Sequence, residues 1–277
     1  MENTRFEDLD GKKESSNDEQ LGKYWASLGD IFINDAFGTC HRAHASNVGI
    51  ASYLPNGIGF LIEKELLALE KVNNPDRPLT VIIGGSKVSD KIGLIKNLVK
   101  KCDNVLIGGA MAFTFLKAKG FNIGKSLLDV ESIDFCASIL NDYPNVLVPA
   151  DSIQTNEISE KTITNVTVNI DDDKMGIDIG PKTIEQFKQI LDSSKTIIWN
   201  GPVGMFEYPN FSNGTKEICS ILASSNAFTI VGGGDTSSAV KNFGFADQMN
   251  HVSTGGGATL EFLEGKKLPG IEIIEDK

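Results

Sequence analysis

The chain has 277 residues, long enough for one large domain or two modest ones with a substantial core. Hydrophobic residues make up 40% of it and charged residues 23%, close to the averages of globular proteins, which excludes wholesale disorder. The formal net charge of −11 leaves no basic excess to neutralise phosphates in bulk, so we expect no binding to nucleic acid or to an anionic membrane.

The cysteine pattern and the N-terminal residues favour a cytoplasmic protein. The cysteines are scattered and contain no CxxC pair, so we expect buried or free thiols rather than a structural zinc site or a disulfide framework. The first residues contain no apolar secretory signal, and no stretch approaches the roughly 20 apolar residues of a membrane span. The four cysteines are Cys40, Cys102, Cys136 and Cys219.

The first part of the chain predicts only a few elements. A charged loop over residues 7–20 is followed by an amphipathic helix at 21–28 and a short strand at 31–34. A longer helical run over residues 57–72 stops at the breaker Asn73-Asn-Pro-Asp-Arg-Pro78. A long helix that ends in a Pro-rich turn is typical of a join between two domains.

Strands and helices alternate after this breaker. Mostly apolar strands that alternate with amphipathic helices imply parallel βαβ units, so we predict an α/β fold with a doubly wound parallel sheet. Residues 162–171 alternate more polar side chains and predict an antiparallel edge or hairpin. The expected strands are residues 79–83, 104–107, 145–148, 196–199 and 228–231, and the expected helices are residues 91–101, 133–141, 184–193 and 214–224.

Glycine clusters follow four of these strands, and a fifth cluster lies close downstream. A doubly wound sheet binds its ligand at the carboxyl ends of its strands, and glycine lets backbone N–H groups approach an anion. A single glycine after a strand is usually only a turn, but five clusters favour a nucleotide polyphosphate site. The clusters are Gly84-Gly-Ser-Lys-Val-Ser-Asp-Lys91, Gly108-Gly-Ala-Met-Ala112, Asn200-Gly-Pro-Val-Gly-Met-Phe-Glu207, Gly232-Gly-Gly-Asp-Thr236 and Ser253-Thr-Gly-Gly-Gly-Ala258.

Charged residues in these clusters suit phosphate chemistry. Asp235 offers a hard oxygen to Mg²⁺, which binds through one or two carboxylates plus substrate phosphates. Lys87 and Lys91, four residues apart at an expected helix start, should share one face and contact phosphate, or else form a solvated surface pair. Glu207 could accept hydrogen bonds from a ribose, or be a solvated loop residue.

A second constellation lies upstream, where His41, Arg42 and His44 follow the strand at 31–34. Arg42 could clamp an anion with two parallel hydrogen bonds. The alternative is that Arg42 forms a structural ion pair with Asp35 and that His44 is a histidine satisfied within the core.

Taken together, these segments resemble the phosphoglycerate kinase family, and the resemblance runs from Glu2 to near the C-terminus. It implies two Rossmann-like domains across a cleft. It also implies reversible phosphoryl transfer between 1,3-bisphosphoglycerate and ADP in glycolysis, giving 3-phosphoglycerate and ATP, with Mg²⁺ and ADP or ATP as cofactors. The segments that carry it are Glu2-Asn-Thr-Arg-Phe6, Asn34-Asp-Ala-Phe-Gly-Thr39, His41-Arg-Ala-His-Ala-Ser46, Gly84–Lys91, Met111-Ala-Phe-Thr-Phe-Leu116, Asp178-Ile-Gly-Pro181, Trp199-Asn-Gly-Pro-Val-Gly204, Gly232–Thr236 and His251-Val-Ser-Thr-Gly-Gly-Gly257.

The resemblance also implies roles for single residues. Lys87 matches a lysine that stabilises the phosphoryl group in flight, Asp235 the Mg²⁺ ligand and Glu207 the ribose-binding acid. Arg5 and Arg42 match arginines that bind 3-phosphoglycerate, and Arg42 is also expected to act in catalysis, with Gly256 and Gly257 near the transferring group. The further residues implied at the nucleotide are Gly85, Lys91, Gly109, Ile177, Asn200, Gly233, Gly234 and Thr236.

From this resemblance, we expect a member of the family to carry roughly another hundred residues of the triose-binding domain before Glu2. We therefore expect residues 1–56 to be a remnant of that domain, 57–78 an interdomain helix and linker, 79–260 the nucleotide domain and 261–277 a tail. The remnant should expose apolar surface and be poorly ordered or self-associate, although the family resemblance implies a monomer. The alternative to a kinase is a fragment that binds Mg·ADP or Mg·ATP without significant turnover.

Overall fold

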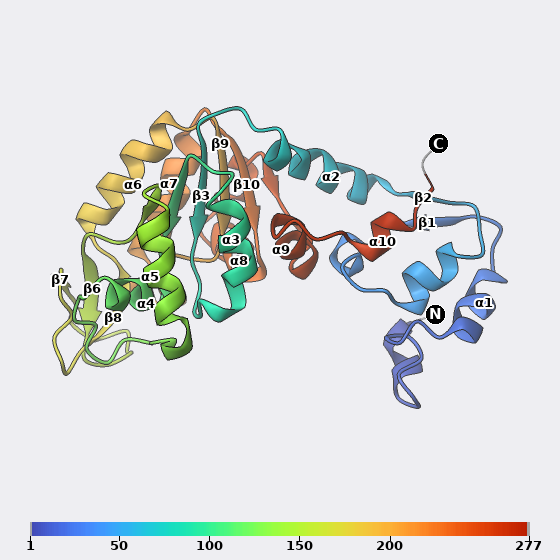
Figure 1. Cartoon of the computed structure of the whole chain (residues 1–277), viewed down its shortest axis with the longest axis horizontal. Coiled ribbons are helices and arrows are strands. Elements are labelled where there is room, and N and C mark those ends of the chain that lie inside the picture. The colour runs from blue at the N-terminus through green and yellow to red at the C-terminus, as the bar shows by residue number, and fades with distance from the viewer. Residues whose placement is uncertain (1, 276–277) are drawn as a thin grey trace. The chain divides into compact units, whose positions relative to one another are not determined.

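The computed structural model describes residues 2–275 (Figure 1). The chain divides into two compact units, with boundaries between Glu70 and Lys71 and between Ser253 and Thr254. We call residues 71–253 the central unit, and the residues before 71 and after 253 the terminal unit. The predicted domain boundaries after residues 56, 78 and 260 stay a prediction, because compactness alone does not show which segments fold independently.

The central unit is built on a six-stranded sheet in which every pair of neighbouring strands is parallel, in the order β11-β10-β9-β3-β4-β5. Apolar strand residues are buried on both faces, as in Val81, which pairs with Val105 on one side and Ile198 on the other. The predicted doubly wound sheet is confirmed. Its strands are β3 (Leu79–Ile83), β4 (Asn104–Ile107), β5 (Val146–Leu147), β9 (Thr196–Asn200), β10 (Phe228–Gly232) and β11 (His251–Val252).

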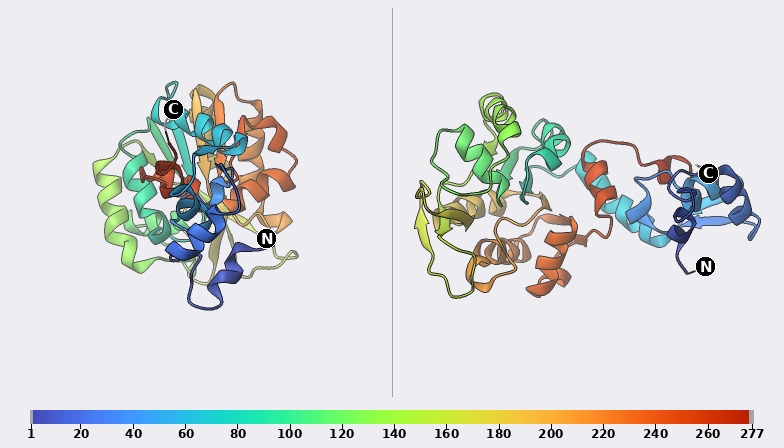
Figure 2. Two further views of the ribbon diagram at one scale, coloured as in Figure 1. Left: turned by 90° about the vertical axis from the view of Figure 1, so that its right-hand side faces the viewer. Right: turned by 90° about the horizontal axis from the view of Figure 1, so that it is seen from below.

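Helices cover both faces of this sheet. The left view of Figure 2 shows the green helices between β3 and β5 on one side and yellow to orange helices on the other. The first group is α3 (Ile92–Leu98), α4 (Met111–Ala118) and α5 (Ile133–Asp142), and the second is α6 (Pro181–Ser193), α7 (Asn213–Ser224) and α8 (Gly234–Asn242).

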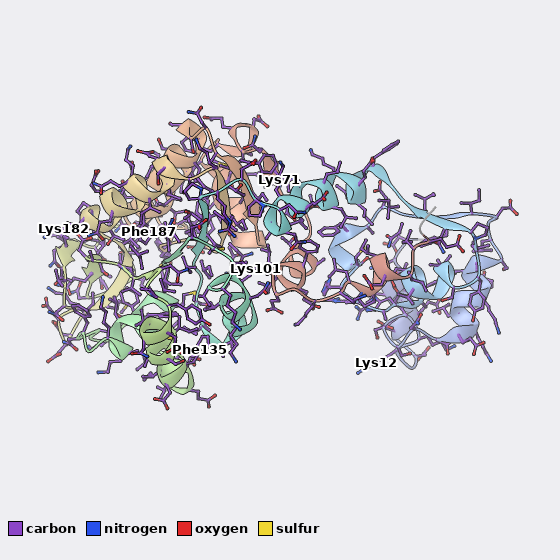
Figure 3. The ribbon with its side chains drawn as sticks, turned by 45° about the horizontal axis from the view of Figure 1, so that its top comes forward. Lys12, Lys71, Lys101, Phe135, Lys182 and Phe187 are labelled. Atoms are coloured by element: carbon purple, nitrogen blue, oxygen red, sulfur yellow. The ribbon has the colours of Figure 1, made fainter. Side chains whose placement is uncertain are left out.

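Helix α6 shows how the sequence specifies one of these elements. Pro181 occupies the first turn, where its missing N–H costs nothing, and Thr183, Phe187 and Leu191 repeat every four residues and are buried. Phe187 lies among the packed side chains of the central unit, whereas Lys182 of the same helix reaches its outer edge (Figure 3).

A separate three-stranded antiparallel sheet completes the central unit. Strand β6 (Ser152–Thr155) lies between β7 (Asn165–Thr167) and β8 (Met175–Ile179). The antiparallel segment predicted at 162–171 is present as β7, but β6 and β8 were not predicted. Strand β6 carries mainly polar side chains, and Gly176 and Asp178 interrupt the apolar residues of β8.

The terminal unit combines α1 (Glu19–Ala26) and the parallel pair of β1 (Phe32–Asn34) and β2 (Asn56–Ile58) with α9 (Gly257–Leu263) and α10 (Pro269–Glu272). Helix α2 (Phe60–Asn73) starts in this unit, three residues later than predicted, since residues 56–58 form β2. Asp35 fixes its start, because the Asp35 Oδ1 accepts hydrogen bonds from the backbone N–H groups of Leu61 and Ile62 at 2.7 and 3.1 Å.

The chain after residue 260 packs within the terminal unit. The Gly270 N–H donates to the Cys40 carbonyl at 2.9 Å, and the Asn34 side chain donates to the Gly270 carbonyl at 3.1 Å. Residues 1–56 expose apolar side chains, as predicted; Leu28 is 66% exposed and Ile31 is 67% exposed.

All four cysteines are free and buried. None of the helices within residues 2–275 combines the length and the apolar character that crossing a bilayer requires.

Candidate functional site

A cavity of about 510 Å³ lies within the central unit, at the carboxyl ends of its strands. The loops that follow β3, β4 and β9 and the start of α8 contribute to its wall, together with β8. The cavity therefore occupies the position at which an open parallel sheet binds its ligand. Its lining residues are Gly85, Ser86, Gly109, Ala110, Gly176, Ile177, Pro202, Gly204, Met205, Glu207, Tyr208 and Asp235.

The glycine loops after β3, β4 and β9 are hydrogen-bonded to one another. The Gly85 N–H donates to the Pro202 carbonyl at 3.0 Å, and the Gly109 N–H donates to the Val203 carbonyl at 2.9 Å. Gly85 and Gly109 have φ angles of +108° and +66°. A Cβ added to Gly109 would lie 2.6 Å from the Gly85 nitrogen. The loops after β3 and β4 can therefore lie this close together only if residue 109 is glycine.

Lys91 lies behind the wall, with its ammonium held by one residue. Its Nζ donates to the Oδ1 of Asn200 at 2.6 Å and to the Asn200 carbonyl at 2.9 Å. Asn200 is itself only 3% exposed. Burial lowers the pKa of Lys91 to about 8, although the Asp235 carboxylate opposes the shift. Lys91 and Asp235 thus interact electrostatically at this edge of the sheet.

Helix α8 begins at the cavity with the loop Gly233–Thr236. Gly233 has a φ of +90° and precedes the first turn, which places the exposed carboxylate of Asp235 on the cavity lining. Thr236 is buried, and its Oγ1 accepts a hydrogen bond from the Gly201 N–H at 2.7 Å. A Cβ added to Gly234 would meet no atom within 4 Å, so the backbone here is open to a ligand.

The donors around Asp235 fit magnesium held in part by a ligand. Within the described residues, no three His, Cys, Asp or Glu side chains gather in an arrangement that could hold a metal ion. Mg²⁺ characteristically binds through one or two carboxylates plus substrate phosphates rather than in an all-protein cage. Asp235, a carboxylate of the cavity lining with the Lys91 ammonium nearby, matches that pattern.

The part of the cavity wall formed by β8 and by residues 205–208 is less polar than the part around Asp235. Ile177 is buried, and its carbonyl accepts a hydrogen bond from the Met205 N–H at 3.0 Å. Glu207 is exposed and lines the cavity beside Tyr208. This side offers an apolar surface with one carboxylate at its rim, which is suited to a nucleoside.

Lys87 and Lys91 do not share a helical face, and that prediction was wrong. Residue 87 precedes the 3₁₀ turn Ser89–Lys91, and α3 begins only at Ile92, so the helical spacing does not apply. Lys87 is exposed, on the same loop as Ser89. The N–H of Ser89 is the main cause of a lowered pKa at Asp129, and the charge of Lys87 adds to that effect.

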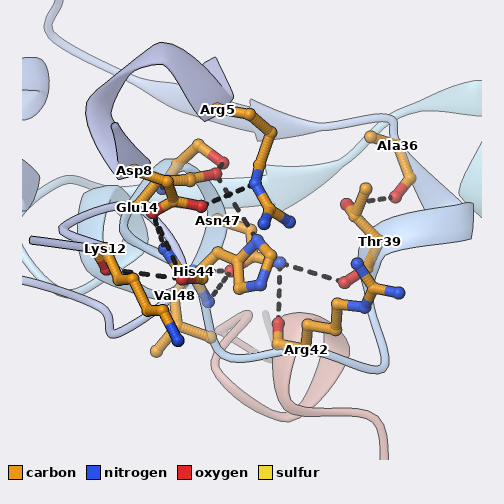
Figure 4. A network of polar contacts seen from close by, with 12 residues as sticks. Arg5, Asp8, Lys12, Glu14, Ala36, Thr39, Arg42, His44, Asn47 and Val48 are labelled. Atoms are coloured by element: carbon orange, nitrogen blue, oxygen red, sulfur yellow. Dashed lines mark hydrogen bonds and ion pairs between the residues drawn. The ribbon is translucent and has the colours of Figure 1, made fainter. Parts of the chain in front are cut away.

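Arg5 and Arg42 lie in the terminal unit (Figure 4). Arg5 Nε is 2.6 Å from Asp8 Oδ2, and half of the Arg5 side chain is exposed. Arg42 is exposed, and its Nε donates to His41 Nε2 at 3.1 Å. The alternative of an ion pair between Arg42 and Asp35 is not observed, because Asp35 binds the start of α2.

A polar network that the sequence did not reveal supports the segment containing Arg42 (Figure 4). Buried Glu14 accepts hydrogen bonds from the N–H and hydroxyl of Ser46 and lies 3.5 Å from His44 Nδ1. Asn47 donates from its side chain to the carbonyls of Thr39 and Arg42 at 3.2 and 2.9 Å. Nothing in the charged loop around Glu14 distinguishes this residue in the sequence.

Gly256 also belongs to the terminal unit, just before α9, with a φ of +49°. A Cβ added to the next residue, Gly257, would lie 3.0 Å from His41 Nε2, so the start of α9 is close to the segment containing Arg42. Of the predicted nucleotide residues, Gly85, Gly109, Ile177, Glu207 and Asp235 line one cavity of the central unit. The structure places Arg5, Arg42 and Gly256 in the terminal unit.

Comparison with known proteins points to a single family. The family model described as phosphoglycerate kinase matches residues 1–266. A phosphoglycerate kinase of Fusobacterium nucleatum is 56% identical over 285 residues, which cover 100% of this chain and 72% of the relative. A phosphoglycerate kinase of Listeria monocytogenes serotype 4b is 55% identical over 283 residues, with 100% and 71% covered.

Solved structures agree with the sequence comparison. The phosphoglycerate kinase of Coxiella burnetii superposes with a TM-score of 0.91 at 43% identity, covering 98% of this chain and 71% of that one. The enzyme of Pyrococcus horikoshii OT3 gives a TM-score of 0.82 at 32% identity, with 92% and 67% covered.

Proposed function

Because this chain belongs to the phosphoglycerate kinase family, we propose that it transfers a phosphoryl group reversibly between 1,3-bisphosphoglycerate and ADP, with Mg²⁺ at the nucleotide. The observation that supports this most directly is the cavity of the central unit. The start of α8, the Asp235 carboxylate and an apolar surface all border this one cavity. Those are the groups that the phosphates, the metal and the nucleoside of a Mg·nucleotide require.

Each part of the cavity has a role in this proposal. Ile177, Gly109 and Gly85 would face the base, and Glu207 would accept hydrogen bonds from the ribose. Gly233, Gly234 and Thr236, at the start of α8, would contact the phosphates, together with Lys91 and Asn200. Asp235 would hold Mg²⁺, which when bound supplies positive charge to the transferring phosphoryl group.

The remaining roles concern transfer and the triose. Lys87, exposed on the loop after β3, would neutralise the phosphoryl group in flight. Arg42 and Arg5 would bind the phosphate and carboxylate of 3-phosphoglycerate, and the backbone of Gly256 would lie near the transferring group. Arg5 would exchange its partner Asp8 for the substrate.

The alternative is a chain that binds Mg·ADP but transfers little phosphoryl group. Its support comes from the terminal unit, in which Arg5 is paired with Asp8 and Arg42 with His41. Catalysis of this kind depends on aligning both substrates, so an incompletely formed triose site would abolish turnover while the nucleotide still bound.

Calorimetry with Mg·ADP, followed by a coupled kinase assay with 3-phosphoglycerate and Mg·ATP, tests the proposal. We expect the Asp235→Asn variant to bind Mg·ADP at least about tenfold more weakly, a loss of about 1.4 kcal/mol, because the metal loses its carboxylate. Asp247→Asn is the matched control, an exposed aspartate of the same unit outside the cavity lining.

Three results are possible for the unmodified chain. Binding with turnover supports the kinase, and binding without turnover supports the alternative. A chain that binds no Mg·ADP would contradict both.

A further inference from the structure

A buried carboxylate lies directly behind the cavity wall. Asp178 follows cavity-lining Ile177 in β8 and is 3% exposed. Its Oδ2 accepts a hydrogen bond from the Gly214 N–H at 2.6 Å, and its Oδ1 accepts one from the Ile179 N–H at 2.9 Å. Burial raises the pKa of Asp178 to about 8, although these two donors act in the opposite direction. Such a side chain is costly to bury and calls for an explanation.

Two glycines from different places in the chain make room for this carboxylate. Gly204 lies in the loop after β9, and Gly214 lies in the first turn of α7. A Cβ added to either glycine would collide with Asp178 Oδ1. Asp178 therefore contacts both ends of the segment formed by residues 204–214.

This segment supplies one edge of the cavity. Met205, Glu207 and Tyr208 all line it. Between its ends, the segment is anchored by buried Phe211, whose ring centroid lies 5.6 Å from that of Tyr208. Met205 is the residue next to Gly204, and its N–H binds the carbonyl of Ile177, the residue next to Asp178. A change at Asp178 would thus reach Met205, Glu207 and Tyr208 through the backbone.

We propose that Asp178 is a positioning residue for the nucleotide, which acts by holding Gly204 and Gly214 against β8 and so fixing the edge formed by Met205, Glu207 and Tyr208. The inference rests on the proposed function of the cavity as a nucleotide site. It assigns Asp178 to the nucleoside end of that site, since the phosphate end is built from the loops of Lys91, Asn200 and Asp235.

The test compares two ligands and two aspartates by calorimetry on the full chain. Mg·ADP probes the whole site, and Mg·diphosphate probes the phosphate end alone. Asp178→Ala should weaken Mg·ADP binding about tenfold and change Mg·diphosphate binding less than about twofold. Asp178→Asn should recover only part of the Mg·ADP affinity, because the amide has the same shape but its single oxygen can accept one of the two hydrogen bonds.

Asp151 is the matched control. It is also 3% exposed, and it accepts hydrogen bonds from the N–H groups of Thr183 and Lys182 at the start of α6, outside the cavity lining. Asp151→Ala should lower the free energy of unfolding without changing either affinity. Hydrogen exchange should increase in residues 204–214 for Asp178→Ala and not for Asp151→Ala.

If Asp178→Ala fails to fold, Gly204→Ala replaces it, because the added methyl pushes the segment away while the carboxylate and α7 remain. The same selective loss of Mg·ADP affinity is expected. Unchanged Mg·ADP affinity, or an equal loss for both ligands, would overturn the inference. Failure of the unmodified chain to bind Mg·ADP would instead contradict the function proposed for the cavity.

Discussion

Lys91 shows how one side chain depends on its surroundings. It lies one residue before α3, where the sequence alone permits either a solvated lysine or a phosphate contact. The structure turns its ammonium inward to Asn200, and burial reduces the stability of the charged form. The consequence is a cation whose charge is sensitive to mildly alkaline pH, unlike that of an ordinary lysine.

We expect the affinity for Mg·ADP to fall as the pH rises through 8. The pKa of Lys91 is lowered to about 8, so the ammonium is charged below that pH and loses its charge above it. If only the charged form of Lys91 supports binding, the affinity for Mg·ADP should fall about tenfold for each pH unit above the pKa. Calorimetry at pH 7, 8 and 9 measures the effect. Lys91→Met should bind more weakly throughout and lose this pH dependence; a constant affinity of the unmodified chain over this range would contradict the role of Lys91.

At the level of elements, packing of helices against the central sheet dominates stability. Helix α6 places Thr183, Phe187 and Leu191 against the core and leaves Lys188 on its outer face, where it pairs with Asp192. Phe187 is completely buried. Its contacts, rather than the surface ion pair, should therefore hold this helix in place.

Phe187→Ala should lower the free energy of unfolding by about 3–5 kcal/mol, through lost burial and the cavity left behind. Urea denaturation measures the change. Lys188→Ala is the control from the neighbouring position, and we expect a loss of less than about 1 kcal/mol because its ion pair is exposed to solvent. Similar losses in the two variants would show that α6 is not anchored by its buried face.

The long apolar elements could be predicted from the sequence, whereas the short polar ones could not. Strand β3 is a short, mostly apolar run between Pro78 and Gly84, and its length and these flanking residues favour a strand over a helix. Strand β6, with the sequence Ser152-Ile-Gln-Thr155, has no such pattern; it is a strand because β7 and β8 pair with it. Pairing with neighbouring strands therefore decides whether such a segment becomes a strand, because its own sequence does not.

The same distinction applies to the candidate site. Glycine clusters after strands predicted the cavity, because backbone conformation at a strand end is a local requirement. The support from Asp178, Glu14 and Asn47 could not be predicted, since each acts on residues that are distant in sequence or ordinary in type. The hydrogen bond between Lys91 and Asn200 joins residues 109 positions apart, so it could not be predicted for the same reason.

At the level of the whole molecule, the terminal unit exposes several isoleucine side chains that lie together. Ile31, Ile33 and Ile58 line a hollow of about 550 Å³ beside the two-stranded sheet. Parallel strands are normally covered on both faces. Association between chains would cover this surface.

We expect self-association that increases with protein concentration, measurable by sedimentation velocity. Ile33→Asp should reduce it several-fold, because burying an unpaired charge opposes association. Ile163→Asp is the control in the central unit, where the isoleucine is 89% exposed. A concentration-independent monomer, or equal effects of both substitutions, would contradict the prediction.

The terminal unit is assembled from both ends of the chain, and this connectivity has a consequence for the order of folding. The bond between Asn34 and Gly270 joins residues 236 positions apart. Closing a flexible loop of that length costs about 5 kcal/mol of chain entropy. Once residues 71–253 have folded, most of that loop is already compact and the remaining search is short. During synthesis, the central unit can therefore fold before residue 270 is available, and residue 34, although made earlier than the central unit, reaches its final partner later.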